Sequence, residues 1–435
     1  MIFHLREILL IIVFMCISYE HEAIAEWVPP HTSVVAPVNK HTDSATPLYS
    51  VQIMTKYVNM QFIHTNFLID VDAPFTWSDC IIIWNWYQNS CPGNTICTSP
   101  VSCEEYQCTD VRTSSSYEHS SCPPPTNSST LPGWGYCTCP VSVVNPINGS
   151  CGEAMLNYDE YAFNATDGRN AFPDFYGIYP NAACAPSSSF ESFPANVSGV
   201  MALSSSSYAL PAFLFGAFPR SFALCLPSVV SATGVLFLGS SPYYFHPHPD
   251  VDIRSLLSYT PFVKHKDSFG YFISVSSIVI KKRSIDVPAN STTKISTIEP
   301  YTTLRTNIYN QVVRRFSMVT KRIPRAKPVA PFGLCFSTFT NGTQVSTKVP
   351  DIDFGLQDGN KWTISTTNSI KKVTKDVACL AFVDGGVSSE HAIIIGTFQM
   401  EDNFLVFDLV NSTLGFSSSL LNKGTSCTSF NFTST

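Results

Sequence analysis

After its first 25 residues the sequence has no apolar run long enough to span a bilayer, which argues against transmembrane helices. It also has no His-Glu-x-x-His, no Gly-x-Ser-x-Gly and no glycine-rich phosphate loop. The motifs of zinc peptidases, serine hydrolases and P-loop proteins are therefore absent. No segment is strongly nitrogen-rich or of low complexity, and few segments have a helical pattern.

Residues 1–25 are predicted to be a signal peptide. Arg6 precedes an apolar stretch over residues 8–17, and Ala23-Ile24-Ala25 forms a small-x-small cleavage motif. Asn-x-Ser/Thr sequons support a secretory route and are predicted glycosylation sites. They are Asn127, Asn148, Asn164, Asn196, Asn290, Asn341, Asn411 and Asn431. We therefore expect a secreted, extracellular glycoprotein.

The cysteines indicate disulfides. Cys16 lies in the predicted signal peptide, which leaves an even number in an oxidising compartment. Most of them lie in a Pro- and Ser-rich insert at about residues 80–184, and Cys225, Cys335, Cys379 and Cys427 are dispersed. A zinc site at Cys137-Thr138-Cys139 or at Cys103 with Cys108 is an alternative, but its spacing is poor. His246-Pro247-His248 is a second metal alternative, although such a pair is more often a polar loop. We expect no metal and no cofactor.

Charge is unevenly distributed along the chain. Residues 26–255 contain 6 Lys and Arg against 17 Asp and Glu, whereas residues 256–435 contain 19 against 12. The whole chain is acidic, with a pI of about 5.9. This balance favours two lobes with different partners over nucleic-acid binding.

Strand patterns dominate, which indicates an all-β protein. Short β-rich segments bounded by turn formers lie at residues 49–53, 61–63, 234–239, 271–275 and 404–408. A helix is predicted over residues 306–319, with Thr306 as its N-cap and an apolar face formed by Ile308, Val312, Val313 and Phe316. A short second helix is predicted over residues 210–218.

One pattern recurs on either side of the chain's midpoint. An apolar run ends at Asp70 and is followed much later by the apolar-apolar-small segment 199–203. A second apolar run ends at Ser296 and is followed by a similar segment at 393–397. The repetition predicts a duplicated β lobe.

The ends of these two runs bear on catalysis. An aspartic protease needs two carboxylates that share one proton, so that one serves as base toward water and the other as acid. Here the two positions offer Asp70 and Ser296, and a serine does not ionise near neutral pH. Asp70 and Asp72 share a strand face and form an alternative pair. However, both come from one loop, which leaves no carboxylate on the opposite side of the cleft. Proteolysis is therefore not expected, and a residual endopeptidase is the weakest alternative.

The landmarks together resemble pepsin-like aspartic proteases over nearly the whole mature chain. Trp77 follows Asp70 at the family's spacing, and residues 393–416 are similar to the family's closing segment. Residues 294–302, 330–336 and 399–403 resemble a plant group more closely. It comprises extracellular dermal glycoprotein, basic 7S globulin, and inhibitors of xyloglucan endoglucanases and xylanases. In the family motif, Thr and Gly follow the aspartate; here Val71 and Asp72 stand at those positions.

The resemblance implies a bilobal fold. We expect an N-terminal extension at residues 26–44, an N-lobe at 45–243 and a C-lobe at 257–435. The resemblance also implies a Cys335–Cys379 bridge within the C-lobe and a Cys225–Cys427 bridge between the lobes. We expect a monomer without proteolytic activity.

The resemblance further implies a protein partner, namely a microbial cell-wall-degrading glycoside hydrolase, bound in the apoplast as a plant defence. Hydrolase clefts are acidic, so basic side chains suit them. The first basic loop (residues 321–328) contains Lys321, Arg322 and Arg325, and Arg325 matches the arginine of family inhibitors. The second basic loop (residues 420–427) has Lys423, with Gly424 where the family uses Arg or His.

Two other interpretations remain open. In the first interpretation, the basic residues of both loops are an ordinary solvated surface. In the second, the chain is a storage or stress protein like the basic 7S globulins, or a peptide-binding protein. Secretion on wounding favours inhibition, whereas confinement to seed protein bodies favours storage.

Overall fold

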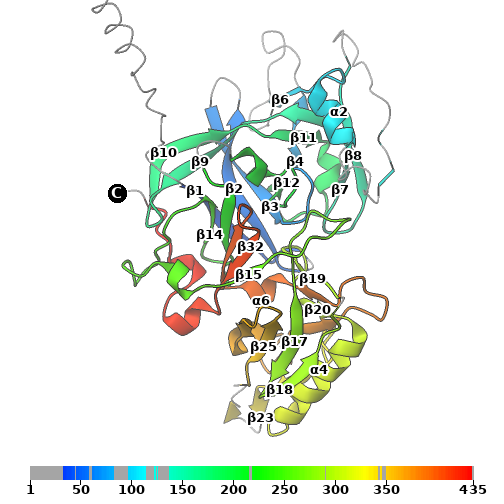
Figure 1. Cartoon of the computed structure of the whole chain (residues 1–435), viewed down its shortest axis with the longest axis vertical. Helices are drawn as coiled ribbons and strands as arrows, with labels where there is room; N and C mark the ends of the chain where they lie inside the picture. Colours follow the sequence, from blue (N-terminus) through cyan, green and yellow to red (C-terminus); the bar gives the residue numbers. More distant parts are fainter. Residues whose placement is uncertain are drawn as a thin grey trace, which may run out of the picture.

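The computed structural model describes residues 33–44, 46–57, 61–82, 97–113, 122–123, 125, 137–214, 218–289, 291–340, 343–344 and 349–433 (Figure 1). The predicted signal peptide and the sequons Asn127, Asn290 and Asn341 lie outside these residues. In the described part of the chain, no helix is long and apolar enough to cross a membrane.

The fold is all-β and bilobal, and one continuous closed sheet builds the upper lobe in Figure 1. Its strands are β1 (Ser33–His41), β2 (Leu48–Tyr57), β3 (Gln61–Asp70), β4 (Trp77–Asp79), β5 (Ile81–Ile82), β6 (Cys97–Pro100), β7 (Pro140–Val144), β8 (Cys151–Tyr158), β9 (Tyr161–Thr166), β10 (Ala171–Ile178), β11 (Asn181–Ala185), β12 (Val197–Ala202), β13 (Ser221–Cys225), β14 (Gly234–Gly239), β15 (Ser258–Pro261), β31 (Phe404–Asp408) and β32 (Thr413–Phe416).

Strands from both chain ends join this sheet. β1 lies in the segment predicted as an N-terminal extension and pairs with β14 and β2. β31 pairs with β13, and β32 pairs with β15, so the C-terminal strands are part of the sheet of the upper lobe. The sheet thus takes strands from both sides of the boundary predicted near residues 243–257.

The lower lobe consists of smaller sheets. The first orders β16 (Phe272–Ile273), β19 (Thr293–Ile295), β30 (Ile393–Ile395), β20 (Thr302–Leu304) and β29 (Phe382–Asp384). The second orders β18 (Arg283–Asp286), β17 (Val275–Ile280), β25 (Ile352–Leu356) and β26 (Lys361–Ile364). The others are β21 (Arg325–Ala326), β22 (Cys335–Ser337), β28 (Val377–Leu380) and β27 (Ile370–Lys372), and the pair β23 (Phe339–Thr340) and β24 (Thr343–Gln344).

Helices are few and mostly short in the described residues. The α-helices are α2 (Tyr106–Thr113), α4 (Thr306–Val319), α5 (Thr366–Ser369) and α6 (Thr397–Met400). The 3-10 helices are η2 (Ser187–Phe190), η3 (Leu210–Phe213), η4 (Ile253–Leu256), η5 (Leu420–Lys423) and η6 (Cys427–Ser429). The predicted second helix is therefore a single 3-10 turn at its start, and residues 215–217 lie outside the described chain.

The long helix α4 has the predicted bounds. Ile308, Val312 and Phe316 are buried on one face, as the apolar spacing predicts. The predicted cap is wrong, because Arg305 is the N-cap residue and makes no side-chain cap. Thr306 is the first helical residue instead, and its hydroxyl donates to Asp384 Oδ1 at 2.6 Å.

The predicted repetition is present as two parallel strand pairs. β3 pairs with β12, so that Asp70 lies opposite Ala202. β19 pairs with β30, so that Ile295 lies opposite Ile395. Each lobe therefore delivers one loop, after β3 or after β19, to the same place between the lobes.

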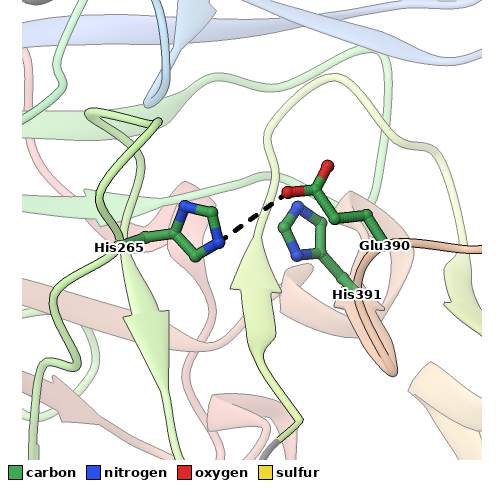
Figure 2. A group of neighbouring side chains, drawn as sticks. All are labelled: His265, Glu390 and His391. Atoms are coloured by element: carbon green, nitrogen blue, oxygen red, sulfur yellow. Dashed lines mark ion pairs between the residues drawn. The ribbon is translucent and has the colours of Figure 1, made fainter.

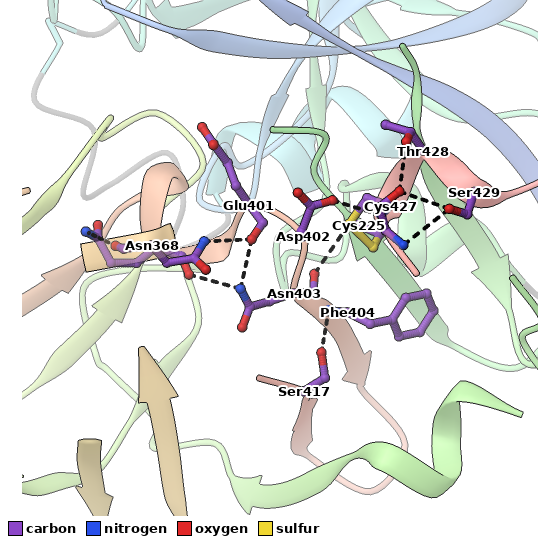
Figure 3. Close-up of a disulfide and its surroundings, with 12 residues drawn as sticks. Cys225, Asn368, Glu401, Asp402, Asn403, Phe404, Ser417, Cys427, Thr428 and Ser429 are labelled. Carbon is purple, nitrogen blue, oxygen red and sulfur yellow. Dashed lines mark hydrogen bonds between the residues drawn. A yellow bond between two sulfur atoms is a disulfide. The ribbon is translucent and has the colours of Figure 1, made fainter. Parts of the chain in front are cut away.

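Apolar packing and a disulfide join the N-terminal and C-terminal halves of the chain. Phe222 on β13 stacks on Phe407 of β31 at 4.4 Å between ring centroids. Cys225, at the end of β13, is bonded to Cys427 (Figure 3). The Cys427 N–H donates to Asp402 Oδ1 at 2.9 Å, which connects the bridge to the turn before β31. These contacts fix the C-terminal segment against the N-lobe.

Candidate functional site

The two repeated loops meet through Thr297. The Thr297 hydroxyl donates to the carbonyl of Ile69 at 2.7 Å and accepts from the Val71 N–H at 3.3 Å. Thr297 follows Ser296 as Val71 follows Asp70, so Val71 is the symmetric position. Because valine has no hydroxyl, the opposite loop cannot return these two bonds. The link between the loops is one-sided.

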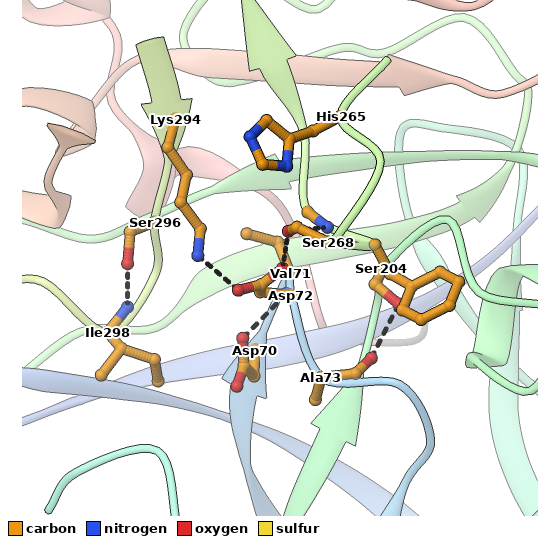
Figure 4. A network of polar contacts seen from close by, with 12 residues as sticks. Asp70, Val71, Asp72, Ala73, Ser204, His265, Ser268, Lys294, Ser296 and Ile298 are labelled. Carbon is orange, nitrogen blue, oxygen red and sulfur yellow. Dashed lines mark hydrogen bonds and ion pairs between the residues drawn. The ribbon is translucent and has the colours of Figure 1, made fainter. Parts of the chain in front are cut away.

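Ser296 lies in the second loop and is turned toward its own backbone (Figure 4). Its Oγ accepts from the N–H of Ile298 at 3.2 Å and of Glu299 at 3.1 Å. These local hydrogen bonds from side chain to backbone stabilise the turn of the loop, as they do where Asn or Asp forms an Asx-turn. A hydroxyl in this position supplies neither a proton acceptor at neutral pH nor a negative charge.

Asp70 is buried at the end of β3. Its Oδ1 accepts from the Asp72 N–H at 2.8 Å. Burial, and then the nearby negative charge of Asp72, raise the pKa of Asp70 to about 6. The carboxyl group is therefore stabilised in its neutral form, without a second carboxylate from the other lobe.

Asp72 forms the polar contact that spans the two loops (Figure 4). Its carboxylate makes an ion pair with Lys294 of β19 and accepts from Ser268 Oγ at 2.6 Å. Burial alone would raise the pKa of Asp72, but the charge and hydrogen bond of Lys294 outweigh it and lower the pKa. Asp72 therefore remains ionised and engaged, which argues against Asp70 and Asp72 as a makeshift acid–base pair.

Lys294 and Ser268 were not predicted as site residues. Both are far from Asp72 in sequence, and although Lys294 begins the segment 294–302 that carries the resemblance, nothing in that segment indicates a contact with Asp72. One feature of the sequence could have indicated this contact. Lys294 is a charged residue that lies in a short strand between Thr293 and Ile295, which are both buried. A charge there needs a partner in the fold.

A cavity of about 860 Å³ lies above these loops. Asp70, Asp72, Lys294 and Ser296 line it, together with a segment that we call the cleft hairpin (residues 263–272). Val263 and Phe272 close this hairpin through an antiparallel bridge. The volume is in the range of small-molecule and peptide sites.

The first basic loop follows α4. Lys321 and Arg322 are exposed. The Arg325 guanidinium instead turns back to the helix, donating to the Ser317 carbonyl at 2.7 Å and lying over the Phe336 ring at 4.7 Å. Arg325 Nη1 also donates to Thr320 Oγ1 at 3.3 Å, and Nη2 donates to Ser317 Oγ at 3.1 Å, so this exposed side chain is held in one orientation.

The second basic loop contains η5, and Gly424 is the C-cap of this turn with a φ of 75°, which suits glycine. Lys423 is exposed. A Cβ at Gly424 would lie 3.6 Å from His248 Nε2. The structure therefore brings the exposed His248 beside Gly424 of this loop. Sequence reasoning had considered His248 only for metal binding.

The structure contains both bridges that the resemblance implies, Cys225–Cys427 and Cys335–Cys379. In the predicted insert it bonds Cys80 to Cys184, Cys103 to Cys137, Cys108 to Cys139 and Cys122 to Cys151. The cysteines of the alternative zinc sites are therefore used in disulfides.

The described sequons differ in accessibility. Asn148, Asn196 and Asn411 are exposed. Asn164 and Asn431 are half-buried, and their side-chain amides donate to the Phe172 carbonyl and to Asn170 Oδ1 at 2.8 Å each. Glycosylation at these two positions would have to replace those bonds.

Asp70→Asn is expected to stabilise the protein near neutral pH by about 3 kcal/mol, at about 1.4 kcal/mol per pKa unit. The folded pKa of Asp70 is raised from the ordinary 3.8 to about 6, so the folded state holds the extra proton between these values. The stability from this group is fully present below the unfolded pKa and is lost as pH rises through about 6. Denaturant unfolding of both proteins at about pH 4 and about pH 7 measures the difference.

Wild type and Asp70→Asn should have similar stability at the acidic pH. Asp159, whose pKa burial also raises to about 6, is retained in the variant and will preserve part of the pH dependence. An identical pH dependence in the two proteins would contradict the assignment of the effect to Asp70.

Comparison with known proteins agrees with this geometry. A family model described as "Xylanase inhibitor N-terminal" matches residues 50–240, and one described as "Xylanase inhibitor C-terminal" matches residues 270–418. Gamma conglutin 1 of Prunus dulcis is 36% identical over 402 residues, 90% of this chain and 88% of that protein. A protein named probable aspartic proteinase GIP2, from Nicotiana benthamiana, is 33% identical over 432 residues, 92% of each chain.

A solved structure is also similar. The crystal structure of a protein named edgp superposes with a TM-score of 0.77 at 32% identity, covering 93% of this chain and 99% of that chain. The matches span both lobes and include the segments that form the loops of the cleft. The chain therefore belongs to the xylanase-inhibitor family of pepsin-like aspartic protease homologues.

Proposed function

We propose that this chain is a secreted, proteolytically inactive protein that binds and inhibits microbial cell-wall-degrading glycoside hydrolases, either xyloglucan endoglucanases or endoxylanases. The cleft floor supports this proposal most directly. Among the described residues, no carboxylate of the other lobe is hydrogen-bonded to Asp70, Ser296 is engaged by its own loop, and Asp72 is paired with Lys294. Peptide hydrolysis needs two carboxylates that share a proton, so this arrangement favours a binding role.

Secretion and a role outside the cell are part of the same proposal. The predicted signal peptide over residues 1–25 and the disulfides of the described chain support it. Such a protein would act in the apoplast or cell wall, where microbial hydrolases attack plant polysaccharides.

The two basic loops are the proposed contact surfaces. A glycosidase cleft carries two carboxylates, and charge-assisted hydrogen bonds to carboxylates are strong. Lys321 and Arg322 are exposed in the first basic loop, and Lys423 is exposed in the second, next to Gly424, which lies close to His248. Arg325 is already immobilised by Ser317, which lowers the entropy lost on binding.

An inhibition panel tests the proposal. The secreted, glycosylated protein is titrated against microbial xyloglucan endoglucanases and endoxylanases, with an acid-protease assay in parallel. We expect dose-dependent loss of one glycanase activity and no proteolysis. Proteolysis abolished by Asp70→Asn would contradict the inactive assignment, and silence across the panel would contradict the inhibitor assignment.

Arg325→Ala is expected to weaken the complex at least about 30-fold, the effect of a hot spot of about 2 kcal/mol. The matched control is Lys372→Ala, because Lys372 is an exposed cation of the same lobe outside both basic loops. Surface plasmon resonance with the responsive hydrolase measures both. Equal effects of Arg325→Ala and Lys372→Ala would contradict the loop assignment. Arg325→Lys retains the positive charge but not the guanidinium, so it shows which of the two the complex depends on.

A storage, stress or peptide-binding role is the second candidate. The match to gamma conglutin 1 and the cavity of about 860 Å³ favour it. Localisation in seed protein bodies, together with silence in the hydrolase panel, would support this role over inhibition.

A further inference from the structure

A cluster of metal-binding side chains lies at the cleft, outside the loops of Asp70 and Ser296. His265 of the cleft hairpin approaches Glu390 and His391, which precede β30 (Figure 2). One potential ligand atom from each residue lies within 4.8 Å of the other two. His265 Nε2 is 3.7 Å from Glu390 Oε1. All three residues line the cavity.

The two imidazole rings are held in fixed orientations. His265 stacks on Phe272, with 4.7 Å between ring centroids. Its Nδ1 is buried and has no hydrogen-bond partner among the described residues, so Nε2 is the nitrogen that it presents. His391 Nδ1 is 2.8 Å from the Thr292 hydroxyl, which leaves His391 Nε2 available. Such a hydrogen bond to the second ring nitrogen orients histidine ligands of metals.

We propose that His265, Glu390 and His391 form a zinc-binding site at the cleft. Two imidazoles and one carboxylate are a common zinc donor set, and a water completes a tetrahedron. Metal–ligand distances of about 2.0–2.2 Å require ligand atoms about 3.4 Å apart. Because the atoms lie within 4.8 Å of one another, they must approach by up to about 1.4 Å, which requires a small shift of the cleft hairpin toward His391 as well as movement of the Glu390 side chain, which is 73% exposed.

The charges around the cluster permit a cation. Lys264, Lys266 and Lys294 line the same cavity and would oppose it. Lys294, however, is neutralised by its ion pair with Asp72. Asp267, which also lines the cavity, offsets one of the other two lysines, and Glu390 as a ligand contributes its negative charge to the ion itself.

Metal binding would fix the cleft hairpin to the C-lobe. The hairpin already contacts the N-lobe, because Ser268 donates to Asp72 and the Phe269 carbonyl accepts from Ser205. A zinc ion on His265 would hold its other side to the loop before β30. The site would thus stabilise one wall of the cavity, and this inference does not depend on the proposed inhibition.

Zinc titration tests the site on the secreted full chain. After removal of metals with EDTA and then of the EDTA itself, ZnCl2 is titrated in by isothermal calorimetry. We expect one saturable site per chain. His265→Ala and His391→Ala should abolish it, and Thr292→Val, which removes only the orienting hydroxyl, should weaken it about 10–100-fold. Cobalt substitution should give the visible absorption of a tetrahedral site in the wild type but not in these variants.

His248→Ala is the matched control, because His248 is an exposed histidine outside the cluster and belongs to the other metal alternative. It should bind zinc as the wild type does. Denaturant unfolding in the presence of EDTA shows whether each variant is folded. Glu390→Gln, which changes the shape of the side chain very little, is a further test and should also weaken zinc binding. Unchanged zinc affinity in the His265 and His391 variants, or loss only in the His248 variant, would overturn the proposal.

Discussion

Replacing Cys225 and Cys427 together by alanine is expected to lower the free energy of unfolding by about 5 kcal/mol. The bridge joins residues separated by 202 positions, so its removal frees a very long loop in the unfolded chain. A chain-entropy estimate for a loop of about 200 residues gives this magnitude. Since the free energy of unfolding of a folded protein is typically only about 5–15 kcal/mol, this loss would be a large part of the protein's stability.

The control is the second implied bridge, Cys335–Cys379. Its cysteines are also buried, so the cavity left by each alanine pair is comparable. Its sequence separation is 44, for which the same estimate gives about 4 kcal/mol. Denaturant unfolding of the two double variants measures the difference, and a larger loss for the Cys335–Cys379 pair would contradict the loop-length argument.

Loss of the Cys225–Cys427 bridge should also have a local effect. Lys423 and Gly424 precede Cys427 closely, and the bridge anchors the second basic loop to β13. Without it, the loop would have to be ordered on binding, which costs affinity. The first basic loop does not contain this bridge, so Lys321 and Arg322 should keep their contribution to the hydrolase complex.

The sequence predicted the parts of the fold that local patterns encode. The strand segments, the bounds of α4 and the repeated apolar runs that become β3, β12, β19 and β30 all follow from residue type and spacing over short distances. The cap at Thr306 was wrong because Asp384, a tertiary neighbour, engages the hydroxyl. Local propensity predicts capping only where no such competitor exists.

The site was predicted less completely than the fold. Asp70 and Ser296 could be singled out because each ends an apolar run. Lys294 opposite Asp72, His248 beside Gly424 and His265 beside Glu390 could not, because each contact joins residues far apart in sequence. Spacing does not encode such contacts, and a lone charge or histidine in a sequence is most often solvated surface. The tertiary fold turns these residues into a site.

Lys40→Met is expected to destabilise the protein by about 3–5 kcal/mol, which is the cost of leaving a buried charge without its partner. Lys40 on β1 donates to Glu401 Oε1 at 2.7 Å, and Tyr49 donates to the same oxygen at 2.7 Å. The side chains of Lys40 and Glu401 are only 4% and 8% exposed. Burial raises the pKa of Glu401, and the charge of Lys40 offsets this effect. Removing Lys40 therefore leaves a carboxylate in an environment that disfavours its charge.

A double-variant cycle separates the ion pair from simple packing. Lys40→Met with Glu401→Gln removes both charges, so the double variant should recover most of the stability that Lys40→Met alone loses. Lys361→Met is the surface control. Its ion pair with Asp353 at 3.1 Å involves a lysine side chain that is 65% exposed, and such pairs contribute about 0–1 kcal/mol. Equal losses in Lys40→Met and Lys361→Met would contradict a buried role for Lys40.

This ion pair also explains why the lobes are expected to move little relative to each other. Lys40 lies in β1 of the N-terminal sheet, and Glu401 directly follows α6 of the C-terminal half. Together with Cys225–Cys427 and the Phe222–Phe407 stack, it links the N-terminal and C-terminal halves of the chain through charge, covalent bond and apolar contact. A binding protein gains from such rigidity because less conformational entropy is lost in the complex. If Lys40→Met lowers stability and weakens hydrolase binding, while Lys361→Met does neither, then the rigid link between the lobes supports the binding surface as well as the fold.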